Sequence, residues 1–190
     1  MSKLFDNLGL VLIIGVAVAV LIVVFPDSGY RPPTGELING VLQWLHVFFG
    51  IVWIGLLYYF NFVQIPTMPA IPAELKPGVS KYIAPKALFY FRWGAAFTVL
   101  TGLLLAWSYG ELDDAFLLRE PARLIGIGMW LALIMAVNVW VIIWPNQKKV
   151  LGLVEADDAS KAKAARTALV ASRTNVLLSI PMLLAMTNMH

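Results

Sequence analysis

The chain contains no cysteine among its 190 residues, and only 13% of its residues are charged. Without cysteine, this chain cannot form a disulfide, an iron–sulfur cluster, a thiolate zinc site or a covalent c-type haem attachment. Hydrophobic residues make up 60% of the sequence, whereas soluble domains have roughly 45–50% apolar and about 25% charged residues. This balance excludes a soluble globular protein and a disordered one, and it predicts an integral membrane protein with one domain.

The sequence also lacks the residue patterns of common soluble enzymes. It contains no Ser/His/Asp arrangement, no glycine-rich phosphate loop and no His-Glu-x-x-His zinc motif. Catalytic residues therefore stay unassigned. The formal net charge of +3 does not call for a nucleic-acid partner, because the basic residues follow the membrane topology described below.

Five apolar stretches are long enough to cross a bilayer as helices, which takes roughly 20 residues. The predicted fold class is all-α, with five transmembrane helices of which the second to fifth form a bundle. A signal peptide is the competing interpretation of the first stretch, but only Lys3 precedes it as a basic residue and no small-x-small cleavage site follows. The predicted spans are residues 7–26, 38–64, 89–109, 123–144 and 172–190.

Two segments on the predicted inner side are longer than simple turns. Residues 65–88 contain five prolines, and this spacing predicts an ordered, extended crossing rather than a helix. Residues 155–171 are rich in alanine, with acidic residues before basic ones, an order that complements a helix dipole. We expect a cytoplasmic helix there that continues into the fifth span, in which Pro181 introduces a kink.

The basic residues are distributed unevenly between the two sides of the membrane. With five spans, eleven of the fourteen Lys and Arg residues fall on the side of the N-terminus. Because positive charge is retained inside, the N-terminus is expected in the cytoplasm and the C-terminus in the periplasm of a bacterial inner membrane. The three on the opposite side are Arg31, Arg119 and Arg123.

The outer loops are acidic, and the loop before the fourth span carries most of this charge. We interpret Glu111, Asp113 and Asp114 as a solvated acidic patch rather than a catalytic carboxylate pair. Such a patch can attract a basic periplasmic partner, for example a cytochrome c.

The two histidines, His46 and His190, are predicted at similar depth in the outer half of the membrane. The second span enters from outside and the fifth ends there. Two neutral imidazoles from different helices can ligate the iron of a b-type haem. Gly50 follows His46 by one helical turn and leaves room for a flat macrocycle, and Trp53 follows on nearly the same face.

Less specific interpretations of these residues remain open. A histidine near a helix end often lies half wet at the interface, as Trp44 beside it also suggests. Met186 precedes His190 by one turn and is a possible cofactor contact. Met182, Met186 and Met189 are alternatively soft ligands for haem or copper, or packing residues.

Other polar and small residues inside the spans have structural explanations. Arg92 is expected at the inner interface, either with its charge in water or paired with an anionic ligand. Asn138 is predicted to form a hydrogen bond between helices. Small residues predict close helix packing at Thr98, Thr101, Gly102, Gly126 and Gly128.

Four stretches together resemble the membrane domain of the bacterial urate hydroxylases, the urate oxidase N-terminal family. The resemblance covers roughly residues 38–190. The stretches are Leu45–Gly55, with a His-x3-Gly-x2-Trp-Ile-Gly motif that begins at His46, then Phe91–Gly94, Ile143–Lys148 and Ser172–His190.

The resemblance implies urate oxidation at the membrane, with electrons passed to a cytochrome c domain outside. This chain departs from the family pattern in two ways, since it has no cysteine for such a domain and is shorter, with fewer helices. We therefore expect a short form, a haem b-binding redox protein that passes electrons to a separate periplasmic cytochrome c. Enzymatic turnover of urate stays a weaker expectation. The alternative is a non-catalytic accessory subunit of a larger respiratory or photosynthetic complex.

Overall fold

In the computed structural model, residues 6–25, 29 and 36–187 are described, and every regular element within these ranges is a helix. Four helices are long and apolar enough to cross a membrane, which supports a membrane protein of all-α class. They comprise Leu37–Ala70, Lys76–Ser108, Arg123–Val150 and Asp158–Thr187.

The first apolar helix, α2 (Leu8–Val24), has 17 residues and is shorter than the other four. The sequence predicts five spans, whereas four helices of sufficient length are found among the described residues. The helix ends at Val24 because the next residue, Phe25, is extended at φ −82° and ψ 116°, as sterics favour for a residue that precedes proline. At its other end, the Asn7 side chain accepts a hydrogen bond from the Leu10 N–H at 3.2 Å.

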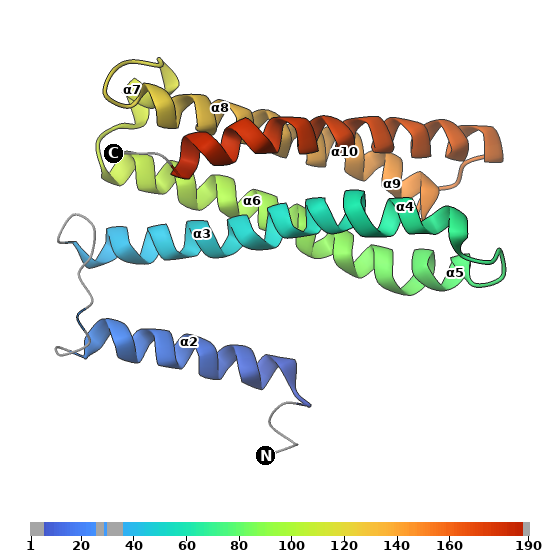
Figure 1. The fold of residues 1–190 in the computed structure, drawn as a ribbon, viewed down its shortest axis with the longest axis horizontal. Helices are drawn as coiled ribbons and strands as arrows, with labels where there is room; N and C mark the ends of the chain where they lie inside the picture. The colour runs from blue at the N-terminus through green and yellow to red at the C-terminus, as the bar shows by residue number, and fades with distance from the viewer. Residues whose placement is uncertain (1–5, 26–28, 30–35, 188–190) are drawn as a thin grey trace. The chain divides into compact units, whose positions relative to one another are not determined.

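The chain divides into two compact units, residues 1–40 and residues 41–190. In the second unit, α3 (Leu37–Tyr58) and α6 (Ala84–Ser108) run antiparallel, and so do α8 (Arg123–Val137) and α10 (Asp158–Thr187). Figure 1 shows the short helix α7 (Leu112–Phe116) at the end where α10 stops. The connections between helices of each pair lie at the opposite end.

The long helices contain short segments of different winding. The first continues from α3 through η2 (Tyr59–Gln64), α4 (Ile65–Thr67) and η3 (Met68–Ala70). The second begins with α5 (Lys76–Gly78) and η4 (Val79–Ile83). The third continues from α8 through η5 (Asn138–Ile143) and α9 (Trp144–Val150). Of these segments η2, η4 and η5 are π-helices.

The prediction of an extended crossing over residues 65–88 is wrong. Helix continues to Ala70 and resumes at Lys76, so only residues 71–75 connect the two spans. A proline ring in a helix clashes with the carbonyl four residues before it. The wider π-turn upstream relieves that contact, because its hydrogen bonds span five residues. Each π-helix ends two residues before a proline: Gln64 before Pro66, Ile83 before Pro85 and Ile143 before Pro145.

Helix α10 runs without interruption for 30 residues and includes Pro181. The expected cytoplasmic helix and the fifth span are thus one element. Asp157 precedes its first turn, and the Ser160 N–H donates to Asp157 Oδ1 at 2.6 Å. This hydrogen bond holds the pKa of the Asp157 carboxyl below its usual value.

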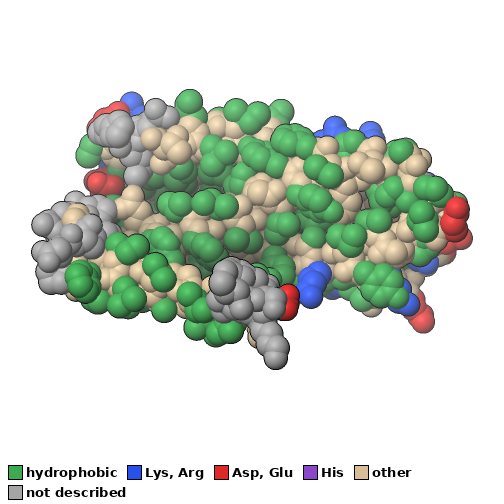
Figure 2. Space-filling view, turned by 60° about the horizontal axis from the view of Figure 1, so that its bottom comes forward, with side chains coloured by type: hydrophobic (Ala, Val, Ile, Leu, Met, Phe, Trp, Pro, Cys, Tyr) green, Lys and Arg blue, Asp and Glu red, His purple; other side chains and the backbone are tan. Residues whose placement is uncertain are grey.

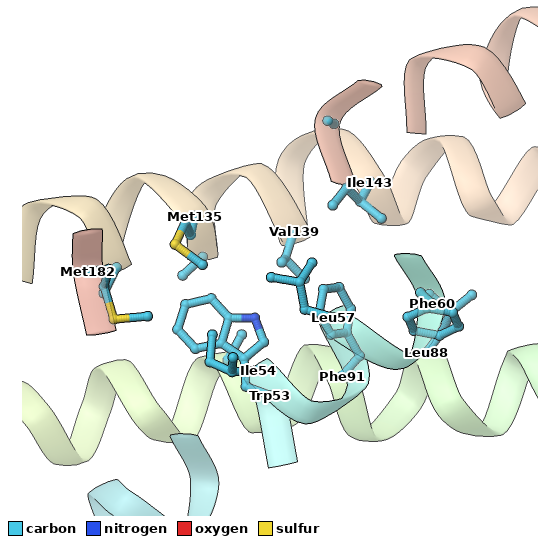
Figure 3. Close-up of a cluster of buried hydrophobic side chains, with 14 residues drawn as sticks. Trp53, Ile54, Leu57, Phe60, Leu88, Phe91, Met135, Val139, Ile143 and Met182 are labelled. Atoms are coloured by element: carbon cyan, nitrogen blue, oxygen red, sulfur yellow. The ribbon is translucent and has the colours of Figure 1, made fainter. Parts of the chain in front are cut away.

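The main core lies between α3, α6, α8 and α10. Its most enclosed large side chains include Trp53, Leu57, Phe91 and Met135, each at most 1% exposed. Trp53 lies between the two methionines Met135 and Met182 on one side and Leu57 and Phe91 on the other (Figure 3). On the outside, hydrophobic side chains cover most of the face in Figure 2, as expected of a protein in lipid.

Gly126 of α8 is packed directly against α7. A Cβ atom there would overlap the backbone carbonyl oxygen of Ala115, a residue that is fully buried. The short helix can therefore lie on α8 only because residue 126 has no side chain, as the predicted role of Gly126 in close packing requires.

We expect Gly126→Ala to lower the thermal unfolding midpoint in detergent, because overpacking against backbone typically costs about 1–3 kcal/mol. The matched control is Gly55→Ala, also within a transmembrane helix, where a Cβ meets nothing within 4 Å. The control should keep or slightly raise the midpoint, since alanine favours helix. Equal midpoints for both variants would contradict the assigned contact.

Candidate functional site

The contact between α3 and α6 is formed by small residues spaced four apart. A Cβ on Gly94 would lie 3.2 Å from the backbone nitrogen of Trp53, and one on Gly102 would lie 2.7 Å from Cε1 of His46. Between them, a Cβ on Gly50 would lie 3.9 Å from the Thr98 methyl. The two helices approach closely along this line, as small residues permit in membranes.

His46 is held in one orientation by α6. Its Nδ1 lies 2.9 Å from the carbonyl oxygen of Thr98 and 3.5 Å from the Thr101 hydroxyl. Because a carbonyl only accepts, Nδ1 carries the hydrogen and donates it. In the neutral ring the other nitrogen, Nε2, is then the one with a free lone pair. This is the arrangement of metal-ligating histidines, whose second nitrogen donates to a carbonyl or carboxylate.

The other predicted site residues on α3 share the face of His46 that contacts α6. Gly50 faces Thr98, and Trp53 is fully buried against Gly94. Met186 of α10 instead contacts α8, where its Cε would lie 3.2 Å from a Cβ on Gly128. His190 lies outside the described residues, so the structure brings His46, Gly50 and Trp53 together and says nothing of the second imidazole.

A second group of polar side chains joins α10 to α3 and η2 on one side and to α8 and η5 on the other. Its α10 members are Ser172, Asn175 and Ser179, all buried on one face. On the α3 side, Asn61 Nδ2 donates to the Ser172 hydroxyl at 2.8 Å, and the Tyr58 hydroxyl lies 3.0 Å from that of Ser179. These hydrogen bonds lie within helices long and apolar enough to cross a membrane, where unpaired polar groups would be costly.

On the α8 side, two asparagines form reciprocal hydrogen bonds between helices. Asn138 Nδ2 donates to Asn175 Oδ1 at 2.7 Å and to the Ala171 carbonyl at 2.9 Å. Asn175 Nδ2 donates in turn to the Met135 carbonyl at 3.1 Å. The predicted interhelical role of Asn138 is confirmed, and its partner is Asn175.

Sequence reasoning did not assign Asn61, Asn175 or the two serines to a site. Their signal is present in the sequence, because positions 172, 175 and 179 follow the spacing of one helix face. What the spacing does not specify is which neighbouring helix that face meets. Three buried atoms of this region have no hydrogen-bond partner within the described residues: Trp53 Nε1, Asn61 Oδ1 and Asn138 Oδ1.

Arg92 of α6 stacks on an aromatic ring. Its guanidinium carbon lies 3.4 Å from the centroid of the Trp144 ring and 5.9 Å from that of Trp140. The charge is thus placed on the face of an indole, a favourable cation–π geometry. This contact lies toward the end of the bundle opposite α7, away from His46.

A side-chain hydrogen bond and an ion pair stabilise the acidic segment around α7. The Trp130 indole N–H donates to the Phe116 carbonyl at 3.1 Å, and Arg123 forms an exposed ion pair with Glu120 at 3.1 Å. Asp113 and Asp114 lie in the first turn of α7. Within the described ranges, no group of three or more His, Asp or Glu residues could hold a metal ion.

A family model described as urate oxidase N-terminal matches residues 114–190. The match contains two of the four stretches that carry the resemblance, Ile143–Lys148 and Ser172–His190, and supports a urate oxidase-like family over this part of the chain. It does not extend over His46 or Phe91–Gly94. No curated protein and no solved structure matches the chain.

The Asn138–Asn175 pair should show measurable coupling in a double-mutant cycle. Replacing each residue by alanine, singly and together, is expected to give a coupling energy of about 0.6–1.7 kcal/mol, the range found for hydrogen bonds between membrane helices. The measurement is reversible unfolding in mixed micelles. Thr174→Ala is the control partner, because its hydroxyl bonds only to the Val170 carbonyl of its own helix. Coupling of Asn138 to Thr174 as large as that to Asn175 would contradict the assignment.

Gly102→Ala should displace the His46 ring from the Thr98 carbonyl, because the added methyl would lie within 3 Å of both Cε1 and Nδ1. Imidazole ¹⁵N chemical shifts in micelles report which nitrogen carries the proton. We expect the Nδ1–H form in the unmodified chain and its loss in this variant. Gly50→Ala, whose methyl would make only an ordinary contact, should leave the spectrum unchanged. A spectrum of Gly102→Ala identical to that of the unmodified chain would refute the contact.

Proposed function

We propose that the chain is a haem b-binding redox protein of the bacterial inner membrane, resembling the membrane part of the urate hydroxylases. The observation that carries this proposal is the geometry of His46. A neutral imidazole with Nδ1–H bonded to the Thr98 carbonyl presents Nε2 as a ligand of fixed orientation. The donor set fits a b-type haem, which needs only one or two axial ligands from the protein.

In this proposal His46 and His190 are the two residues that would hold the haem iron. Thr98 and Thr101 fix the tautomer of His46, and Gly102 allows the ring to lie against α6. Gly50, Trp53 and Met186 are the neighbouring cofactor contacts proposed from the sequence. A bound haem supplies one-electron transfer by cycling between ferric and ferrous iron.

The electron acceptor in this proposal is a periplasmic cytochrome c. His46 lies nine residues after the start of α3, the end of the bundle that the charge distribution assigns to the periplasm. The carboxylates around α7, Asp113 and Asp114 among them, lie at that same end (Figure 1). Negative charge at this end would accelerate encounter with a basic partner.

Urate is the proposed electron donor because of the similarity over residues 114–190. This similarity covers the second part of α7 and the segments from α8 to α10, but no residue of α3. The substrate therefore rests on family likeness, whereas the haem ligand rests on the described contacts of His46.

A second candidate function is that of an accessory subunit in a larger membrane complex. The observation that favours it is α2, an apolar helix with no buried residue in the structure. A helix that is hydrophobic all round contacts lipid or another chain. This candidate predicts stable association with other membrane chains and no bound haem.

The absorbance spectrum separates the two candidates. The chain, expressed with haem supplied and purified in mild detergent, should show a Soret band and sharp α and β bands after dithionite reduction. His46→Ala should lose the haem, and His46→Met should retain it with shifted bands. Gly55→Ala, at an open position of the same helix, is the control that keeps the spectrum. Folded protein without these bands, or full haem content in His46→Ala, would overturn the haem assignment.

A further inference from the structure

Two cationic side chains from different helices meet at one indole ring. Arg92 of α6 lies with its guanidinium carbon 3.4 Å from the centroid of Trp144, and Lys148 of α9 has its Nζ 5.9 Å from the same centroid. Like charges repel, so two cations around one neutral ring call for a compensating anion.

The described chain provides no carboxylate for this pair. Its ion pairs join Arg123 to Glu120 and Lys161 to Asp158, and neither involves Arg92 or Lys148. The helices that carry the two cations, residues 76–108 and 123–150, contain no Asp or Glu. An anion from another molecule could therefore complete this pair.

Arg92 itself is incompletely paired. Its Nε and Nη1 are shielded and have no hydrogen-bond acceptor, whereas Nη2 is not among the shielded unpaired atoms. A buried cation without an acceptor is costly. Stacking on Trp144 compensates only part of this cost, because a cation–π contact provides attraction but no hydrogen-bond acceptor for these N–H groups.

The site lies at the inner boundary of the membrane. Sixteen residues separate Arg92 from Ser108 at the outer end of α6, which is about 24 Å at 1.5 Å per residue. Twenty-one separate Trp144 from Arg123, about 32 Å by the same rise. The hydrocarbon core is about 30 Å thick, so Trp144 is placed at the headgroups and Arg92 reaches toward them from just inside.

The surface around the two cations is apolar. Phe89 and Trp93 of α6 are 48% and 42% exposed, and Val141 of η5 is 65% exposed. An anion bound here has acyl-chain surface beneath it and cytoplasm above it. These surroundings favour a phosphate that is attached to a lipid over one that is free in solution.

We propose that Arg92, Lys148 and Trp144 bind the phosphate of an anionic phospholipid in the inner leaflet. Arg92 donates from its open edge, Lys148 contributes a second charge from the aqueous side, and Trp144 keeps the guanidinium in place. The site is independent of the haem proposal, because it lies at the opposite end of the bundle and uses none of its residues.

Lipid binding to the intact chain can be measured by native mass spectrometry after release from nanodiscs that contain phosphatidylglycerol and phosphatidylcholine. We expect retained phosphatidylglycerol on the unmodified chain and about fivefold weaker retention in Lys148→Gln, since a basic residue near the surface is worth about 1 kcal/mol toward anionic lipid. Lys149→Gln is the matched control, as it removes the same charge from the adjacent, more exposed position. Its retention should stay unchanged.

Two further measurements test the role of Arg92 and distinguish a lipid phosphate from free phosphate. Arg92→Lys keeps the charge but loses the planar fork, so retention should fall even where the thermal midpoint is preserved. Millimolar inorganic phosphate, added to protein in phosphatidylcholine alone, should not reproduce the stabilisation by phosphatidylglycerol. Equal losses in Lys148→Gln and Lys149→Gln would overturn the site, and equal stabilisation by free phosphate would overturn the lipid as its ligand.

Discussion

The hydrogen bonds that α10 forms with its neighbours are the interactions on which the rest of the bundle depends. Its buried polar side chains are shielded from water, so each has to find a protein partner. Asn175 accepts a hydrogen bond from Asn138 of η5 and donates one to the Met135 carbonyl of α8, and Ser172 accepts one from Asn61 of η2. One face of one helix thereby joins the two antiparallel pairs. Apolar packing alone would not select this register, because lipid is as apolar as leucine.

The π-helices allow Asn61 and Asn138 to reach the face of α10 that forms these hydrogen bonds. Asn61 and Asn138 both lie in such segments, η2 and η5, and each segment ends two residues before a proline. The wider turn accommodates the proline ring and also rotates the residues before it relative to a regular α-helix. The two asparagines reach neighbouring positions on α10, the Ser172 hydroxyl and the Ala171 carbonyl. Proline tolerance and polar pairing thus have a common structural origin.

The two ends of the bundle carry different chemistry for reasons of solvation. His46 lies toward the end of the bundle that carries α7, and its Nδ1–H donates to the Thr98 carbonyl, which suits ligation of a metal centre through Nε2. Arg92 lies toward the opposite end and rests on the face of Trp144. A neutral imidazole is tolerated within the hydrocarbon, whereas a guanidinium has to reach the headgroups or meet an anion. This difference agrees with the charge distribution of the sequence, which predicts that the end with Arg92 faces the cytoplasm.

An all-α chain with long apolar helices, and polar residues that need partners within them, could be predicted from the sequence alone, because hydrocarbon thickness and polar desolvation act on composition and length. Five such helices were expected, and four of sufficient length are found among the described residues. Asn138 was predicted to pair between helices on these grounds. The helix through residues 65–70 was not predicted, because the number of prolines does not indicate that a π-turn precedes them. The partner of Asn138, Asn175, was not predicted either, because the spacing of residues on one helix face does not specify which helix packs against it. Which nitrogen of His46 carries the hydrogen follows from the tertiary structure and not from the sequence, because Nδ1 donates to the Thr98 carbonyl, 52 residues away on α6.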